Sequence, residues 1–189
     1  SIPQIASQAK HVTVFQRTPN YSMPAWNGPL PAEREREHKA RYVEHRETAR
    51  WSQGGYLKQE NAEPLPFDRP EHVREQLERR WREGGFSMLN AFGDVMTSKE
   101  ANKVVAEFAH EKIREIVTRG EVADLLCPRD HPFGTKRLCV DIDYHETYNR
   151  ENVTLVDIRS TPIEAINATG IRTAGMDHAF DAIVFATGF

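Results

Sequence analysis

The chain has 189 residues, of which 25 are Lys or Arg and 28 are Asp or Glu, giving a formal net charge of −3. This balance gives no reason to expect a nucleic-acid partner, and no apolar run approaches the ~20 residues that a membrane-spanning helix needs. The two cysteines, Cys127 and Cys139, form no CxxC pair, so neither a disulfide framework nor a metal site is predicted. These features favour a cytoplasmic protein with one domain, or one domain carrying an inserted subdomain.

The first predicted elements are a short helix and a strand. Apolar residues recur on one helical face of SIPQIASQAKH (1–11). HVTVFQ (11–16) has the alternation and the β-branched residues of a strand. A helix followed by a strand is half of a βαβ unit, the building block of parallel sheets.

Arg17 and Thr18 follow this strand directly, and Pro19 ends it. An Arg-Thr-Pro turn is usually only a solvated surface feature. In the dinucleotide-binding form of the βαβ unit, however, the end of the second strand lies near the adenosine ribose. Arg17 and Thr18 therefore predict recognition of a ribose 2′-phosphate, and NADP rather than NAD. The glycine-rich turn and the first strand of such a unit are expected to precede Ser1.

Residues 30–125 differ from their flanks in composition, and they predict helices without strands. The segment PAEREREHKARYVEHRETARW (31–51) is dense in charge, and its alternating signs are typical of a solvated face. Trp51 and Trp81 are the large apolar residues expected in the helical core.

Two later helices in this region carry signals at both ends. One is predicted to begin at the capping residue Asp68 and to end at Gly84, with apolar residues recurring every four positions between them. The other is predicted to begin at Thr97 as the capping residue and to end at Gly120.

Residues 126–189 return to the pattern of an α/β fold. NVTLVDI (152–158) is strongly β-prone, and PIEAI (162–166) and GIRT (170–173) are joined by a turn signal. The segment DAIVFATGF (181–189) predicts a mostly buried strand that runs into a turn of small residues.

Four segments together resemble Baeyer–Villiger monooxygenases of the cyclohexanone, phenylacetone and steroid monooxygenase type. They are SIPQIASQAKHVTVFQRTPNYSMPA, DHPFGTKRLCVDIDYHETYNRENVTLVD, PIEAINATGI and DAIVFATGF. The resemblance implies an FAD- and NADPH-dependent enzyme that inserts one oxygen atom from O2 next to a ketone carbonyl, giving an ester or lactone. The glycine-rich FAD-binding motif and the fingerprint motif of that family are not in this chain.

The resemblance also implies the fold and the domain plan. The fold class is α/β: an incomplete Rossmann-like NADP-binding domain formed by residues 1–29 and 126–189, with an all-helical subdomain inserted at 30–125. The FAD domain of the same polypeptide would be its partner. FAD is not expected to bind to this segment alone, which would then be inactive by itself.

Carried onto matching positions, the resemblance makes Arg17, Thr18 and Lys136 contacts of the NADP 2′-phosphate. Arg137 matches the family's active-site arginine, a fixed cation that stabilises the anionic oxygenating species. From the residues alone, Lys136 and Arg137 would be an ordinary surface pair.

The small-residue turn at Ala186, Thr187 and Gly188 would lie at the cofactor, where the NADP domain rejoins the FAD domain. His131, His145 and Asp143 could suggest ligands, but they are predicted to be surface residues of a loop and a helix.

Two alternatives remain open at this point. One is a flavin-dependent N- or S-hydroxylating monooxygenase, which shares the plan of two dinucleotide domains. The other is a helical binding module without catalysis, in which Arg17 and Lys136 need not lie near each other. Whether those two side chains face a shared cleft separates the enzyme from the binding module.

Overall fold

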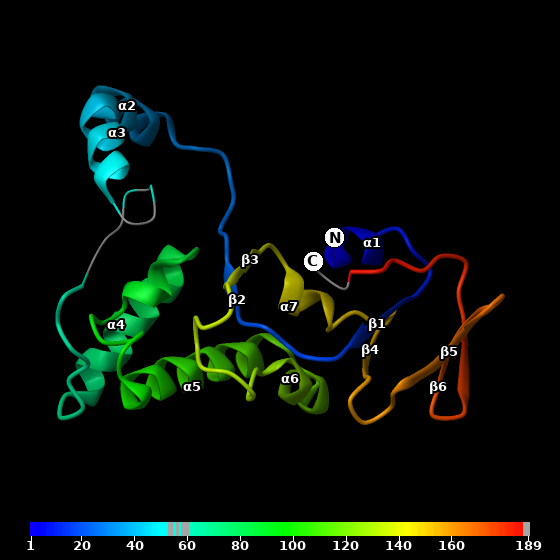
Figure 1. The fold of residues 1–189 in the computed structure, drawn as a ribbon. Helices are drawn as coiled ribbons and strands as arrows, with labels where there is room; N and C mark the ends of the chain where they lie inside the picture. The colour runs from blue at the N-terminus through cyan, green and yellow to red at the C-terminus, as the bar shows by residue number, and fades with distance from the viewer. Residues whose placement is uncertain (53–54, 56, 58–60, 187–189) are drawn as a thin grey trace.

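The computed structural model describes residues 1–52, 55, 57 and 61–186, and it combines helices with short strands (Figure 1). The helices are α1 (Ile2–Ala6), α2 (Ala32–Ala40), α3 (Tyr42–Trp51), α4 (Pro70–Glu83), α5 (Lys99–Ile116), α6 (Gly120–Leu126) and α7 (Tyr144–Thr147), with a short 3₁₀ turn at Ser87–Asn90. The strands are β1 (Val12–Gln16), β2 (Ser22–Pro24), β3 (Cys139–Asp141), β4 (Val153–Asp157), β5 (Ile163–Asn167), β6 (Gly170–Thr173) and β7 (Met176–Ala179).

Two parallel strand pairs join the beginning of the chain to its last third. β1 pairs with β4 from Val12↔Val153 to Gln16↔Asp157, and β2 pairs with β3 from Ser22↔Cys139. The predicted strands at 11–16 and 152–158 are thus confirmed. Because parallel strands share a direction, the exits of β1 and β4 lie at one edge.

The strands β5, β6 and β7 form a separate antiparallel sheet. Its first turn is fixed by Asn167, whose Oδ1 accepts hydrogen bonds from the backbone N–H groups of Thr169 (2.9 Å) and Gly170 (2.8 Å). The predicted hairpin is therefore confirmed, and its turn depends on an asparagine side chain.

The predicted strand at DAIVFATGF is wrong for the part that the structure describes. Residues 182–186 are irregular, and Val184 and Phe185 are 73% and 69% exposed. A strand exists only by pairing with a neighbour, and in the described chain no strand pairs with this segment. Thr187 and Gly188 lie outside the described residues.

The described residues of 30–125 form helices and no strands. The apolar stripe predicted in α4 is confirmed, since Val73, Leu77 and Trp81 are buried. Trp51 was expected in the core and is 78% exposed, because α2 and α3 bury no residue against which it could pack.

The predicted helix ends are partly wrong. Asp68 does not cap α4: Arg69 holds the N-cap position, and Pro70 opens the helix. In α5 the cap is Ser98 rather than Thr97, with Ser98 Oγ accepting from Ala101 N at 3.1 Å. This hydroxyl directly precedes the first helical residue, which is where it can reach a free N–H group.

One glycine ends a helix as predicted, and the other begins a helix instead of ending one. Gly84 caps α4 with a φ of 72°, and a Cβ there would lie 2.4 Å from the carbonyl oxygen of Pro24 in β2. Only glycine permits both the conformation and the close approach of helix to strand. Gly120, predicted to end α5, instead begins α6, because α5 has already ended at Ile116.

The buried side chains form two clusters. The larger contains residues of α4 and α5 together with Tyr21, Met23, Phe133 and Leu138. The smaller joins the end of α5 to α1, α6, α7 and β4. The long helix α5 therefore contributes residues to both clusters, and Figure 1 shows it running from α4 toward α6.

Candidate functional site

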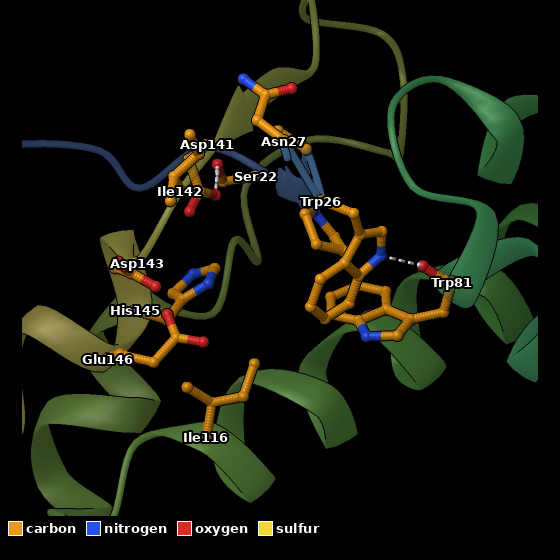
Figure 2. Close-up of a pocket in the computed structure, with 12 residues that line it drawn as sticks. Ser22, Trp26, Asn27, Trp81, Ile116, Asp141, Ile142, Asp143, His145 and Glu146 are labelled. Atoms are coloured by element: carbon orange, nitrogen blue, oxygen red, sulfur yellow. Dashed lines mark hydrogen bonds between the residues drawn. The ribbon is translucent and has the colours of Figure 1, made fainter. Parts of the chain in front are cut away.

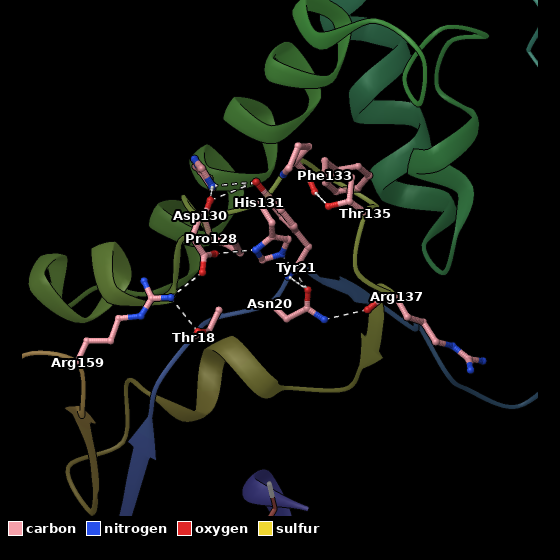
Figure 3. A network of polar contacts seen from close by, with 12 residues as sticks. Thr18, Asn20, Tyr21, Pro128, Asp130, His131, Phe133, Thr135, Arg137 and Arg159 are labelled. Carbon is pink, nitrogen blue, oxygen red and sulfur yellow. Dashed lines mark hydrogen bonds and ion pairs between the residues drawn. The ribbon is translucent and has the colours of Figure 1, made fainter. Parts of the chain in front are cut away.

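The two segments that carry the candidate site residues lie side by side, although they are far apart in the sequence. Asn20 Nδ2 donates to the carbonyl oxygen of Arg137 at 2.8 Å, and Cys139 N donates to the carbonyl oxygen of Tyr21 at 3.0 Å (Figure 3). The pairing of β2 with β3 continues this contact. The exit of β1 and the entry to β3 thus form one polar edge.

The candidate cations on these segments are exposed. Arg17, Lys136 and Arg137 are exposed to solvent. In the described part of the chain none of them forms an ion pair. The Arg137 side chain points away from the polar cluster around Asp130 (Figure 3). Free cations at such an edge are available to an anionic ligand.

Thr18 belongs to a network of hydrogen bonds between three segments. Arg159 Nη2 donates to Thr18 Oγ1 at 2.9 Å and to Asp130 Oδ2 at 2.6 Å. His131 Nδ1 lies 2.7 Å from the other oxygen of Asp130, and His131 Nε2 lies 3.3 Å from Asn20 Oδ1. The network therefore runs from Thr18 to the residue that holds the Arg137 backbone.

The carboxylate of Asp130 is the centre of this network. The hydrogen bond from His131 and that from Arg159, with the added charge of Lys136, hold the pKa of Asp130 well below its usual range. Lys136 thus acts electrostatically on the same cluster that contains Thr18. Of the three expected 2′-phosphate contacts, Thr18 is linked to Asp130 by hydrogen bonds through Arg159.

Asn20, Asp130 and Arg159 belong to this network, and the sequence analysis did not single them out. Arg159 could have been found from the rule that ligands bind at the carboxyl ends of parallel strands, because it follows the β-prone run at 152–158. Asn20 and Asp130 give no such local signal.

His131 and His145 were expected on the surface, and both are buried. The His131 side chain is 7% exposed, and its ring packs edge-to-face on that of Tyr21, with 5.5 Å between the ring centroids. His145 is 3% exposed, and its Nε2 has no partner among the described residues. Burial lowers the pKa of His145. Asp143 is exposed as predicted.

A cavity of about 240 Å³ lies between β2, β3 and α7. Figure 2 shows Trp26 and Trp81 on one side of it and His145 on the other, with Trp26 Nε1 donating to the carbonyl oxygen of Trp81 at 3.1 Å. Across the described ranges, no group of three or more His, Cys, Asp or Glu residues could hold a metal ion. No helix in the described part of the chain is long and apolar enough to cross a membrane.

Ala186 is exposed and lies beyond the last strand. Thr187 and Gly188 lie outside the described residues. The structure thus brings together the segments bearing Arg17, Thr18, Lys136 and Arg137.

No protein-family model matches the chain. Over its whole length it is 39% identical to the 2-oxo-Δ3-4,5,5-trimethylcyclopentenylacetyl-CoA monooxygenase of Pseudomonas putida, of which it covers 35%. It is 38% identical over its whole length to a Baeyer–Villiger monooxygenase of Pseudooceanicola batsensis, again covering 35%. It is 34% identical over 96% of its length to the phenazine N-monooxygenase of Lysobacter antibioticus, covering 34%.

Solved structures of monooxygenases are also similar to this chain. An oxidised steroid monooxygenase bound to NADP matches 95% of this chain with 43% identity and a TM-score of 0.87, and 34% of that protein is covered. OTEMO in complex with FAD and NADP matches all of this chain with 37% identity and a TM-score of 0.92, with 35% of it covered. The resemblance to Baeyer–Villiger monooxygenases is confirmed, and the chain spans about a third of the length of these relatives.

Proposed function

We propose that the protein containing this chain is an FAD- and NADPH-dependent Baeyer–Villiger monooxygenase. It would insert one oxygen atom from O2 next to the carbonyl of a ketone, giving an ester or lactone. The similarity to relatives of this type extends along the whole chain. Because the chain spans a third of them, it would supply part of the active site and be inactive alone.

The observation that carries the proposal is the meeting of the two candidate segments. Asn20 holds the carbonyl group of Arg137 at 2.8 Å, so the segment with Arg17 and Thr18 is fixed beside the segment with Lys136 and Arg137. Exposed cations beside the Thr18 hydroxyl group fit a phosphate, which accepts charged hydrogen bonds. A binding module without catalysis would not require this convergence.

The proposed fold is an incomplete Rossmann-like NADP-binding domain formed by residues 1–29 and 126–189. The parallel pairing of β1 with β4 supports it, since this is the arrangement of a βαβ unit. Residues 30–125 would be the inserted helical subdomain. The FAD domain of the same polypeptide would complete the enzyme, and FAD would bind there rather than to this chain.

Each candidate residue has a role that follows from its position. Arg17, Thr18 and Lys136 would bind the 2′-phosphate of NADPH. When bound, NADPH supplies hydride and FAD supplies the chemistry of oxygen activation. Arg137 would place a rigid cation where negative charge develops on oxygen, and its backbone is already fixed by Asn20.

Three further assignments belong to the proposal. Ala186, Thr187 and Gly188 would form the small-residue turn at the cofactor. The ketone and O2 are the proposed small-molecule partners. The proposed location is the cytoplasm, in keeping with the unpaired state of Cys127 and Cys139.

The test is the substitution Arg137→Ala in the intact protein. Loss of one preorganised donor to a developing oxyanion costs about 3–4 kcal/mol, so ester formation from a cyclic ketone should slow roughly 100–1000-fold. Flavin reduction by NADPH builds no comparable charge on oxygen and should slow much less. Stopped-flow spectroscopy of both half-reactions, with product analysis, measures the two effects.

Arg137→Lys is the matched variant, and it should rescue little because a flexible ammonium cannot reproduce the planar guanidinium. Ester formation at the wild-type rate in Arg137→Ala would remove Arg137 from the active site. An intact wild-type protein that oxidises no NADPH in the presence of FAD would contradict the proposed function itself.

A further inference from the structure

We propose that Arg159 is a further determinant of the preference for NADPH over NADH, binding the 2′-phosphate beside Thr18. This inference rests on the proposed function, and it assigns a role to a residue outside the set of Arg17, Thr18 and Lys136. The two cofactors differ only in the 2′-phosphate, so a residue that binds this group discriminates between them.

The position of Arg159 is the first argument. β1 and β4 are parallel neighbours, and their last residues, Gln16 and Asp157, are in register. Thr18 and Arg159 each follow two residues after these ends, at the edge where ligands of open α/β sheets bind. Arg159 therefore stands on the neighbouring strand at the same level as Thr18.

The turn that carries Arg159 is held by Asp157. The Asp157 carboxylate accepts from the backbone N–H of Arg159 at 3.0 Å and from Ser160 Oγ at 3.0 Å. Thr161 Oγ1 donates to the Asp157 carbonyl oxygen at 2.7 Å. A backbone fixed in this way limits the entropy lost when the side chain binds a ligand.

The bond from Arg159 to Thr18 orients the hydroxyl group. A guanidinium can only donate, so in the 2.9 Å contact the Thr18 oxygen is the acceptor. The hydroxyl hydrogen of Thr18 is then free to donate to an anion. Arg159 thus prepares Thr18 as a phosphate donor before any ligand arrives.

Arg159 also has N–H donors that are available to a ligand. Both recorded bonds of its side chain, to Thr18 and to Asp130, come from Nη2. Within the described residues, Nε and Nη1 have no recorded partner, and the side chain is 51% exposed. Three N–H groups therefore remain for an incoming phosphate.

The local charge also suits a phosphate. Asp130 and Asp157 supply two negative charges at this edge, and Arg17, Lys136 and Arg159 together supply three positive ones. A ribose phosphate carries close to two negative charges at neutral pH, as phosphorylated hydroxyl groups in proteins do. The excess of positive charge at this edge matches that ligand.

The experiment is a calorimetric titration of the intact protein with NADP⁺ and NAD⁺, and with 2′,5′-ADP and 5′-AMP as short probes. In Arg159→Gln, the Kd for NADP⁺ and 2′,5′-ADP should rise roughly tenfold, as expected for a charged hydrogen bond. The Kd for NAD⁺ and 5′-AMP should change less than about twofold, because they lack the 2′-phosphate.

Arg172→Gln is the matched control, since Arg172 is 50% exposed and paired with Asp177 at 2.8 Å in the antiparallel sheet. It should alter neither affinity. Arg17→Gln tests the proposed function separately and should also weaken binding of the 2′-phosphate selectively.

The outcomes separate the two proposals. If Arg17→Gln is selective but Arg159→Gln affects all four ligands equally or none, Arg159 is only a structural ion-pair partner and this inference fails. If the wild-type protein itself does not prefer 2′,5′-ADP to 5′-AMP, the proposed function fails with it. Should Arg159→Gln not fold, Arg159→Lys must retain part of the selectivity for the inference to stand.

Discussion

Two helix pairs of this molecule, α2 with α3 and α4 with α5, have a similar density of charged residues but differ in how they pack. Neither α2 nor α3 buries a residue, whereas α4 and α5 together contribute seven buried residues to the larger core cluster. In Figure 1, α2 and α3 stand away from the rest of the chain, whereas α4 and α5 lie next to the other helices and strands. Helix-forming residues and alternating charges produce a helix, but only an apolar stripe makes it part of the fold.

The difference extends to the candidate site. Asn102 in α5 donates to the carbonyl oxygens of Val95 (3.0 Å) and Phe133 (2.9 Å), and it accepts from Phe133 N at 2.9 Å. Phe133 lies between Asp130 and Lys136 in the loop of the polar edge. The packed helix pair therefore holds the proposed cofactor loop.

The largest effect on stability is expected from Phe108→Ala in α5. Phe108 is 2% exposed and meets the ring of Trp81 edge-to-face at 6.3 Å. Removing it should lower the free energy of unfolding by about 3–5 kcal/mol, measured by guanidinium denaturation of the intact protein. Phe108→Leu should cost clearly less. A loss below about 1 kcal/mol, against that expectation, would mean that α4 and α5 are no more tightly packed than α2 and α3.

A somewhat smaller loss, about 2–3 kcal/mol, is expected from Asn102→Leu, because it leaves buried backbone groups of Phe133 unpaired. Unlike Phe108→Ala, it should also weaken NADP⁺ binding, since the loop that carries Lys136 loses its support. Denaturation and calorimetry measure the two effects. Asn102→Asp keeps the acceptor for Phe133 N but places a carboxylate oxygen against two carbonyl oxygens, so it should not restore the stability. Unchanged NADP⁺ binding in Asn102→Leu would mean that the helix pair does not support the candidate site.

The smallest effect is expected from Trp51→Ala in α3. Its ring is largely exposed, and its Nε1 donates only to Glu47 one helical turn away, at 2.8 Å. The free energy of unfolding should change by less than about 0.5 kcal/mol. Trp81→Ala in α4 is the matched comparison, with an expected loss of about 3–5 kcal/mol. Equal losses for the two tryptophans would erase the distinction between the helix pairs.

What could be predicted from the sequence follows from how local each signal is. The strands around Val14 and Leu155 and the turn at Asn167 are encoded by neighbouring residues, and they are confirmed. The fate of Trp51 depends on whether other elements lie over it, which periodicity does not reveal.

The same reasoning applies to the site. Arg17 and Lys136 were identified by the sequence around them, and their assignment stays a prediction. Asp130 and Arg159 become candidates only through contacts between segments that meet in space. The burial of His131 has the same origin, since Asn20 and Tyr21 reach it only after folding.

The parallel pairing of β1 with β4 and of β2 with β3 also bears on the order of folding. The pairs Val12↔Val153 and Ser22↔Cys139 can form only after the chain ends on either side of the whole helical stretch have come together. Closing so long a segment costs chain entropy before any ladder hydrogen bond forms, whereas α4 and α5 are close in sequence. We therefore expect the helical core to form first and to shorten the effective loop. The polar edge that holds Thr18, Asp130 and Arg159 would then assemble last and open first in local unfolding.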